Sequence, residues 1–371
     1  MLSIFKNYSL QFICYDYVMK HLSDYKEEIT RCSKCGLCQS VCPVYNETGN
    51  DCAVSRGKFV MLDGVLKGDL KLNKNIIKYI DMCLKCGKCE DFCPSGIKVC
   101  KIFETAKYQY LKNKFFGKFI FFLESEFVFN NIIKFLSVLK NQKKIRYKGK
   151  LKLLYFKGCY GNIFPKTEIL LNKLATKLNI EIIEKDFECC GIPFLSSGNL
   201  KRFEDAKVKN LNFLNCNFDY IFTDCASCES TLINYYQIDK SKLLNLGELI
   251  VKQNIKFKSE KNIKVTFHKP CHLKDAVFFK SLIDNCKNVE YIEMENFDDC
   301  CGFAGEFALK NHKLSKTLSL KKAKNVINTG ADYVITVCPS CILGLKQGLS
   351  EFKKTPKVLT LSDFLLKLNI L

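Results

Sequence analysis

The sequence lacks several motifs that would assign a chain of this length to a common enzyme class. It contains neither a G-x-G-x-x-G motif for a dinucleotide nor a P-loop for a nucleoside triphosphate. No segment offers an evident place for a flavin. We therefore expect no flavin and no hydride chemistry in this chain, and a separate subunit must supply or receive its electrons.

Targeting signals and membrane spans are also missing. The amino terminus has no positively charged start, clean apolar core and small-residue cleavage site, and Met19 is an alternative start. The most apolar run, FFGKFIFFLESEFVF at 115–129, is interrupted by Lys118, Glu124 and Glu126. A membrane helix needs roughly 20 mostly apolar residues. We expect a cytoplasmic chain without a transmembrane segment, with peripheral contact at the inner face of the cell membrane as an open alternative.

Cysteine and positive charge are the two features in excess. The 371 residues, enough for two or three domains, include 23 cysteines and carry a formal net charge of +20. Without a secretory signal, so many cysteines indicate metal ligands rather than disulfides. No nucleic-acid motif accompanies the charge, so no nucleic-acid partner is expected. Lysines near a thiolate-bound iron–sulfur cluster would instead offset its negative charge.

Two copies of one metal-binding motif lie near the amino end. CSKCGLCQSVCP begins at Cys32 and CLKCGKCEDFCP begins at Cys83, each with the spacing C-x2-C-x2-C-x3-C-P. In this motif three cysteines bind one [4Fe-4S] cluster and the fourth binds the other cluster. The expected ligands are Cys32, Cys35, Cys38 and Cys93 for cluster 1, and Cys83, Cys86, Cys89 and Cys42 for cluster 2. Zinc is the weaker alternative, because it would ordinarily need only paired CxxC units.

The spacer between the two motifs shows helical periodicity. Apolar residues recur near helical spacing within 59–66 and again within 76–80, which predicts an α-helical ferredoxin module. Arg56 and Gly57 lie where a helix can begin, and a contact with a partner or with the cluster is the other interpretation. Residues 101–150 carry 12 basic and 3 acidic side chains and are expected to form amphipathic helices that pack on the next domain or touch a membrane surface.

From residue 151 the chain is a tandem repeat. KLLYFKGCYG at 152–161 corresponds to KVTFHKPCHL at 264–273, and DYIFTDCASC at 219–228 corresponds to DYVITVCPSC at 332–341. The cysteines recur with offsets of 111 to 113 residues, which indicates duplication. Alternating strands and helices, with the helices at 166–178 and 312–328, predict two α/β halves whose cysteines follow strands.

Each repeat contributes five thiols to an expected metal site. The first set is Cys159, Cys189, Cys190, Cys225 and Cys228, and the second is Cys271, Cys300, Cys301, Cys338 and Cys341. Five thiolates exceed the needs of tetrahedral zinc, so an iron–sulfur centre is favoured in one or both repeats and zinc stays the alternative. Gly191 and Gly302 should allow a tight turn beside the adjacent thiols.

The remaining candidates near these sites are less specific. His268 and His272 flank Cys271 and are interpreted as structural histidines, with donation to a cluster sulfur as the alternative. Free thiols without a ligand role are expected at Cys14, Cys52, Cys100, Cys216 and Cys286. The two repeats should face each other about a pseudo-two-fold axis, with both sets of thiols at the shared crevice.

The order of these motifs resembles the iron–sulfur subunit of glycolate oxidase. That protein belongs to a CCG-domain family that is related to heterodisulfide reductase and to the iron–sulfur component of anaerobic glycerol-3-phosphate dehydrogenase. CGLCQSVCPVY, SRGK, CGKCEDFCPSGI and CCGFAGEFAL carry the resemblance, which extends from about Cys32 to the carboxyl end. The first CCG repeat can be degenerate in the glycolate oxidase protein, whereas both are complete here. The resemblance therefore leaves a heterodisulfide-reductase-like function open.

This resemblance implies an α+β multi-domain fold, in which an α-helical ferredoxin with two [4Fe-4S] clusters precedes a tandem pair of α/β CCG domains. The expected boundaries are 1–24 for an extension, 25–105 for the ferredoxin, 106–150 for a basic aromatic linker, and 151–258 and 259–371 for the CCG domains. The implied function is electron transfer from an FAD-binding 2-hydroxyacid oxidase subunit, acting on glycolate or D-lactate, towards quinone or a membrane acceptor. The isolated chain is then not catalytic.

Two alternatives to this function are a thiol–disulfide oxidoreductase and the iron–sulfur subunit of a glycerol-3-phosphate dehydrogenase.

Overall fold

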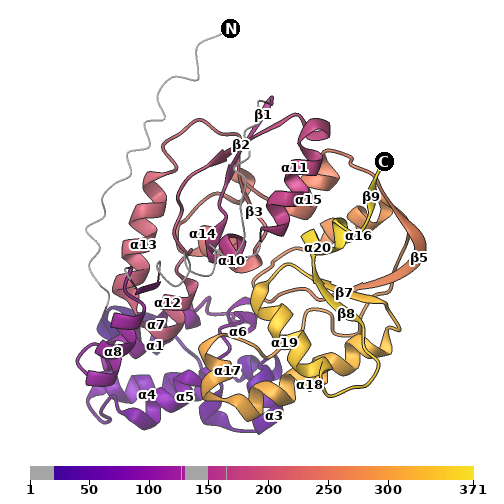
Figure 1. Ribbon diagram of the computed structural model, residues 1–371. Coiled ribbons are helices and arrows are strands. Elements are labelled where there is room, and N and C mark those ends of the chain that lie inside the picture. The colour runs from indigo at the N-terminus through magenta and orange to yellow at the C-terminus, as the bar shows by residue number, and fades with distance from the viewer. Residues whose placement is uncertain (1–20, 127, 130–148, 164) are drawn as a thin grey trace.

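The computed structural model describes residues 21–126, 128–129, 149–163 and 165–371. In Figure 1 a helical amino-terminal part lies below two sheets, one formed by the first repeat and one by the second. Cys14, Met19 and residues 130–148 of the expected linker lie outside the described residues. The overall class, a helical ferredoxin part followed by two α/β domains, is confirmed.

The amino-terminal part contains only helices among its described residues. They are η1 (Leu22–Tyr25), α1 (Lys26–Thr30), α2 (Leu37–Ser40), α3 (Pro43–Thr48), η2 (Asp51–Ala53), α4 (Ser55–Lys67), α5 (Lys74–Asp81), α6 (Lys88–Asp91), α7 (Val99–Leu111) and α8 (Phe115–Leu123). The expected helical spacer is confirmed as α4 and α5. The Asn73 side chain accepts hydrogen bonds from the backbone amides of Asn75 and Ile76, and so caps the amino-terminal end of α5. Buried Ile76, Ile77 and Ile80 then join the core formed with α7.

Two of the expected domain boundaries fall inside single elements. Residue 105 lies within α7, which continues the ferredoxin part to Leu111. Residue 259 lies within β5, an 11-residue strand that begins at Phe257. The domain limits that the resemblance implies therefore stay predictions, and elements cross two of them.

The first repeat is a four-stranded parallel sheet with its helices beside it. Its strands β1 (Leu151–Tyr155), β2 (Ile180–Glu184), β3 (Tyr220–Thr223) and β4 (Leu243–Asn245) lie in the order β2-β1-β3-β4. The helices are α10 (Gly158–Ile163), α11 (Lys166–Leu178), α12 (Ile192–Ser197), α13 (Leu200–Asn212), α14 (Ala226–Asn234) and α15 (Leu246–Lys252), with η3 (Lys240–Lys242).

The second repeat has the same sheet order with one strand added. Its strands β5 (Phe257–Phe267), β6 (Cys286–Tyr291), β7 (Tyr333–Thr336) and β8 (Lys357–Thr360) lie in the parallel order β6-β5-β7-β8, and β9 (Asn369–Ile370) pairs antiparallel with β5. The helices are α16 (Val277–Asp284), α17 (Glu306–Lys310), α18 (His312–Asn328), α19 (Pro339–Leu349) and α20 (Leu361–Leu365). The helices expected at 166–178 and 312–328 are confirmed as α11 and α18 with these bounds.

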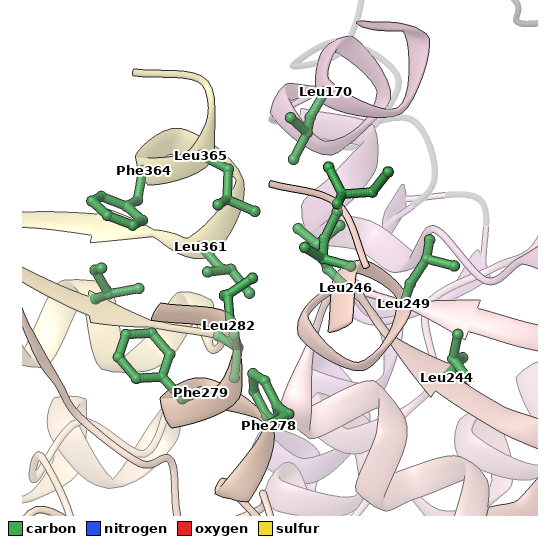
Figure 2. Packing of buried hydrophobic residues seen from close by; sticks show 14 of the residues in the cluster. Leu170, Leu244, Leu246, Leu249, Phe278, Phe279, Leu282, Leu361, Phe364 and Leu365 are labelled. Carbon is green, nitrogen blue, oxygen red and sulfur yellow. The ribbon is translucent and has the colours of Figure 1, made fainter. Parts of the chain in front are cut away.

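One hydrophobic core joins the two repeats. Figure 2 shows Leu170, Leu246 and Leu249 of the first repeat facing Phe278, Leu361 and Leu365 of the second. All six side chains are less than a tenth exposed. Because each repeat buries apolar surface against the other, the pair forms one body and its loops are held in a fixed relation.

None of the helices in the described ranges has both the length and the apolar character needed to cross a bilayer.

Candidate metal centres

The two ferredoxin motifs fold into loops of the same shape. Lys34 and Lys85 adopt positive φ angles of 57° and 53°, and Gly36 and Gly87 follow with 87° and 78°. A left-handed residue reverses the chain direction within the loop, which turns the cysteines on both sides towards one point. The same tight loop occurs in both motifs.

The structure brings the four residues expected at cluster 1 to one pocket. This pocket is lined by Cys32, Cys35, Cys38 and Cys93, together with Cys89 from the second motif. Arg56 also lines it, and its backbone N–H, at the start of α4, donates to the Cys38 thiol. Burial raises the pKa of Cys38, and the Arg56 amide opposes that increase. The two interpretations of Arg56 are therefore compatible, since a helix begins there and its amide faces a thiol.

The residues expected at cluster 2 also lie together. Burial raises the pKa of Cys42, and the nearby Cys83 thiol adds to the increase. Cys89 is close to Cys83 and Cys42, and the Ser55 hydroxyl donates to its Sγ at 3.2 Å. Cys42, the last cysteine of the first motif, therefore lies beside the second motif. That placement fits the predicted exchange of ligands, which stays a prediction until metal is bound and counted.

In the first repeat the five thiols form one connected group. Cys159 and Cys189 have their Sγ atoms 3.7 Å apart. Cys190 accepts hydrogen bonds from the thiols of Cys189 and Cys228, which lowers its pKa well below the ordinary value. The Cys228 thiol also donates a hydrogen bond to Cys225, which by itself would lower the pKa of Cys225. Burial and the nearby thiols of Cys338 and Cys190 outweigh this hydrogen bond, so the pKa of Cys225 is raised.

The second repeat arranges its thiols in the same order. Cys301 accepts hydrogen bonds from Cys300 and Cys341, which lowers the pKa of Cys301 to about 5. Cys341 also donates to Cys338 and lowers the pKa of that thiol to about 6. Cys271 completes the group through its hydrogen bond to Cys300. Five convergent thiols with two acidic members suit a thiolate-bound metal centre, because thiolates are the metal-binding form of cysteine.

The glycines after the adjacent thiols have the expected role. Gly191 and Gly302 have φ angles of 91° and 78°. A Cβ atom at Gly302 would approach the Ser315 carbonyl oxygen to 2.9 Å, and one at Gly191 would approach the Phe203 ring to 2.5 Å. A residue with a side chain would therefore be strained at either position.

The two sets of thiols meet at the junction of the repeats. The amide of Ala226 in the first repeat donates to the Val337 carbonyl of the second at 2.9 Å. The Ser227 hydroxyl lies 3.6 Å from the Cys338 Sγ, and Cys225 and Cys338 line the same crevice. One thiol of each set, Cys225 and Cys338, therefore lies at the junction, as the expected face-to-face arrangement requires.

The ferredoxin part contacts the thiols of the second repeat. Cys86 of the second motif lies near both Cys300 and Cys271. These three cysteines share a small apolar cluster with Phe307 and Leu318. The cysteines therefore form a continuous series from the first motif, through the second motif and the second repeat, to the first repeat.

The two histidines beside Cys271 differ in their surroundings. His272 lies 3.1 Å from the Ser227 hydroxyl through Nδ1 and 3.3 Å from the Lys85 carbonyl through Nε2. It therefore joins all three parts of the chain as a structural histidine. Within the described part of the chain, neither ring nitrogen of His268 has a hydrogen-bond partner, although the side chain is fully buried. The Phe297 carbonyl lies near this ring, and the role of His268 stays a prediction.

Several residues near the thiols were not identified from the sequence. Lys85 extends from the second motif and donates to the carbonyls of Leu195 and Ser196 in the first repeat. Lys88 pairs with Asp299 of the second repeat at 2.9 Å. Both lysines lie inside the motif, but their partners are more than 100 residues away, so local sequence holds no signal for these contacts. Among the cysteines expected to be free thiols, Cys100 lies near Cys83 and Cys89 of the second motif, and Cys52, Cys216 and Cys286 form no disulfide with the described residues.

Family comparisons agree with this organisation. Residues 28–97 match the 4Fe-4S dicluster domain, and residues 153–233 and 265–346 each match the Cysteine-rich domain named CCG. This chain is a CCG-domain iron–sulfur protein. The resemblance to that family is confirmed, and with it the 4Fe-4S dicluster domain and the two cysteine-rich repeats.

The relatives of this CCG-domain protein include components of several redox systems. An uncharacterized iron-sulfur protein of Methanococcus maripaludis is 29% identical over 90% of this chain and 70% of its own length. A probable glycolate oxidase iron-sulfur subunit of Bacillus subtilis is 23% identical over 92% of this chain and 94% of its length. One component of the dihydromethanophenazine:CoB–CoM heterodisulfide reductase of Methanosarcina acetivorans is 24% identical over 88% of this chain and 90% of its length. The chain is thus an iron–sulfur protein of the kind found in multi-subunit oxidoreductases.

A solved structure shares the fold. The crystal structure of a hypothetical protein from Helicobacter pylori aligns with a TM-score of 0.50 and 12% identity over 84% of this chain and 66% of that chain. At this identity the likeness concerns the fold alone, and the redox role follows from the family.

Proposed function

We propose that this protein is the iron–sulfur electron-transfer subunit of a flavin-dependent 2-hydroxyacid dehydrogenase that acts on glycolate or D-lactate. An FAD-binding subunit oxidises the substrate, and this chain relays the electrons towards quinone. The similarity to a probable glycolate oxidase iron-sulfur subunit over nearly the whole of both chains supports this specific role. The isolated chain is expected to be inactive towards the hydroxyacid because it has no identified hydride acceptor.

The ligand sets belong to the same proposal. Cys32, Cys35, Cys38 and Cys93 hold one [4Fe-4S] cluster, and Cys83, Cys86, Cys89 and Cys42 hold the other. Each repeat holds a further centre through its five thiols. Three thiols of one loop with a fourth from the other motif supply the four corners of a cubane cluster.

The observation that carries the electron-transfer role is the continuity of the thiol series. Cys89 lines the pocket of the first motif, Cys86 neighbours Cys271 and Cys300, and Cys338 neighbours Cys225. Metal centres at four such neighbouring positions form a relay without a long gap. A chain that only stored metal would have no need for this succession.

The test is co-purification of the tagged full-length chain under anaerobic conditions, followed by identification of any bound flavoprotein. Addition of glycolate or D-lactate to the complex should reduce the iron–sulfur centres, as seen by EPR. The pure chain should stay oxidised with the same substrates. Substrate oxidation by the pure, flavin-free chain would contradict the proposal, and reduction by glycerol 3-phosphate alone would assign the chain to the alternative dehydrogenase.

The crevice between the repeats favours a second candidate, a thiol–disulfide oxidoreductase. Cys225, Cys338 and Asp224 line it, and one carboxylate oxygen of Asp224 has no hydrogen-bond partner among the described residues. In such a reaction two electrons from the centres and two protons would convert one disulfide into two thiols. Release of two thiols per disulfide by the chemically reduced chain would establish this function. The absence of thiol release with complete centres would exclude it.

Contact with a membrane surface is a further part of the proposal. Helix α8 exposes Phe115, Phe116, Phe119 and Phe122, each by more than half of its accessible area. On the same segment Phe121 stacks on Tyr108, so one side of α8 packs on α7. Flotation with anionic vesicles tests the contact, with replacement of the four exposed Phe side chains by Ser as the comparison. Equal flotation of both proteins would contradict it.

A further inference from the structure

His268 lies fully buried inside the second cysteine-rich repeat. It directly follows β5, its accessible area is 0%, and neither ring nitrogen makes a hydrogen bond with the described residues. The Phe297 carbonyl lies near the ring and could accept a second hydrogen bond besides that of the Lys269 amide at 3.1 Å, but neither ring nitrogen meets it in hydrogen-bonding geometry. Burying a polar group without a well-formed hydrogen bond is unfavourable, so an imidazole in this position is suited to binding another group.

The ring faces two of the proposed metal ligands. A ring nitrogen of His268 and the Sγ atoms of Cys301 and Cys341 all lie within 4.8 Å of one another, and all three residues are buried. Ligand bonds of about 2.0 Å from nitrogen and 2.3 Å from sulfur place tetrahedral ligand atoms roughly 3.5 to 3.8 Å apart. Small movements towards a shared metal atom would therefore give all three residues normal bond lengths.

The first repeat shows that the fold does not require a histidine here. Phe156 occupies the corresponding position, three residues before Cys159 as His268 is three before Cys271. The Phe156 amide donates to the Phe222 carbonyl at 2.8 Å, and the His268 amide makes the equivalent bond to Ile335 at 2.9 Å. Phe156 packs on Phe187 with ring centroids 4.8 Å apart. The first repeat thus has the apolar ring of Phe156 at this position, and the second repeat has the imidazole of His268.

We propose that His268 is a ligand of the second CCG centre and binds, through one ring nitrogen, a metal atom that Cys301 and Cys341 also bind. The second repeat then holds a mixed imidazole–thiolate iron–sulfur centre, whereas the first holds a centre with thiolate ligands only. Imidazole is neutral, so it binds the metal without adding the negative charge that a sixth thiolate would bring, and added negative charge lowers the reduction potential of a cluster.

Since His268 lies among several proposed ligands, the test detects the nitrogen directly. The full-length chain is reconstituted with iron and sulfide, with either natural-abundance or 15N-labelled histidine, and studied by pulsed EPR. We expect a directly bound nitrogen whose coupling changes with the label. This measurement on the unsubstituted protein needs no variant and no flavoprotein partner, so its result is independent of the proposed function.

Two variants assign the signal to one residue. His268→Phe installs the side chain that the first repeat tolerates, and the nitrogen coupling should disappear. His312→Gln changes an exposed histidine and should leave the coupling intact. His268→Cys should keep the metal content but lose the coupling and lower the potential of the centre.

Absence of any imidazole coupling in the unsubstituted chain, or its persistence in His268→Phe, would overturn the proposal. If the second repeat is found to bind zinc, absorption at the zinc edge answers the same question. Imidazole scattering must then be present in the unsubstituted chain and absent in His268→Phe.

Discussion

The two CCG repeats share the order of their thiols but differ in what surrounds them. Cys190 and Cys301 each accept hydrogen bonds from two thiols, and the pKa of each is lowered. Cys225 has a raised pKa, whereas its counterpart Cys338 has a pKa lowered to about 6. Ser227 of the first repeat contributes to that lowering through its hydrogen bond to Cys338. The duplicated ligand geometry is therefore set in two different electrostatic environments.

The repeats also differ in how they contact the ferredoxin part. The second repeat is held by ion pairs in which Lys107 contacts Asp81 and Glu306, and Lys310 contacts the same two carboxylates. The first repeat is held mainly by hydrogen bonds, such as those from Lys85 to the carbonyls of Leu195 and Ser196. One interface thus depends on paired charges and the other mainly on hydrogen bonds, which predicts different responses to mutation and acid.

The largest expected effect is the loss of one centre without the other. Cys301→Ser should remove the metal of the second repeat, and Cys190→Ser should remove that of the first, because each thiol lies at the middle of its group. Iron and acid-labile sulfide per chain, with EPR, measure the loss. Cys286→Ser is the control, since this buried cysteine of β6 lies outside both groups. Equal metal content in all three variants would contradict the ligand assignment.

Asp81→Asn should loosen the second repeat from the ferredoxin part. The substitution leaves the buried Lys107 with only Glu306 as an anionic partner. Removing one partner of a buried ion pair costs about 3 kcal/mol, or roughly a hundredfold in the local opening equilibrium. Hydrogen exchange of the amides of α17 measures the opening. Tyr235→Phe, which removes a hydrogen bond to Glu104 at the first repeat, is the matched control and should leave α17 unchanged.

Acid should open the same interface in the unsubstituted chain. Burial works against ionisation of Asp81, but Lys107 and Lys310 outweigh it and lower the pKa of this carboxyl group. A carboxyl group with a depressed pKa stabilises the folded state above its unfolded pKa of about 4, and that contribution is lost as pH falls through the folded pKa. The Asp81→Asn variant should lack this part of the pH dependence of α17 exchange. Identical pH profiles would remove Asp81 from the explanation.

Gly302→Ala should destabilise the protein more than Gly191→Ala. Both residues have positive φ, which costs a residue with a side chain about 1–2 kcal/mol. The new Cβ at residue 302 would also meet a backbone oxygen, that of Ser315, whereas the one at residue 191 meets the movable Phe203 side chain. Thermal unfolding of the metal-loaded variants measures the difference. A larger loss for Gly191→Ala would show that the Phe203 ring is the more rigid neighbour.

The smallest expected effect is that of Ser227→Ala. It removes the hydroxyl group that contacts Cys338 and His272, a loss of about 1 kcal/mol for one hydrogen bond. The potential of the second centre should fall slightly, because a hydrogen bond to a cluster sulfur favours the reduced form. The first centre should keep its potential. Redox titration followed by EPR separates the two, and Ser340→Ala, at the corresponding place in the second repeat, is the control.

Much of the fold could be predicted because its signals are local. The periodicity of α11 and α18 lies within single segments, and the predicted bounds agree with the structure. Glycine positions such as Gly302 follow from the turn beside adjacent thiols. The extent of β5 could not be predicted in this way. Its first residues pair with β6 and also with β9, and β9 lies more than 100 residues later in the chain.

The sequence alone determined which thiols are available, how they are grouped and that the second half is duplicated, because these properties depend on spacing along the chain. Tertiary structure decided which groups are neighbours. Cys86 meets Cys271 and Cys300 only because the ferredoxin part docks on the second repeat. His268 differs from His272 for the same reason. Packing places the His268 ring beside Cys301 and Cys341, with no hydrogen bond to the described residues, and places the His272 ring between Lys85 and Ser227. Such contacts leave no pattern in the chain order.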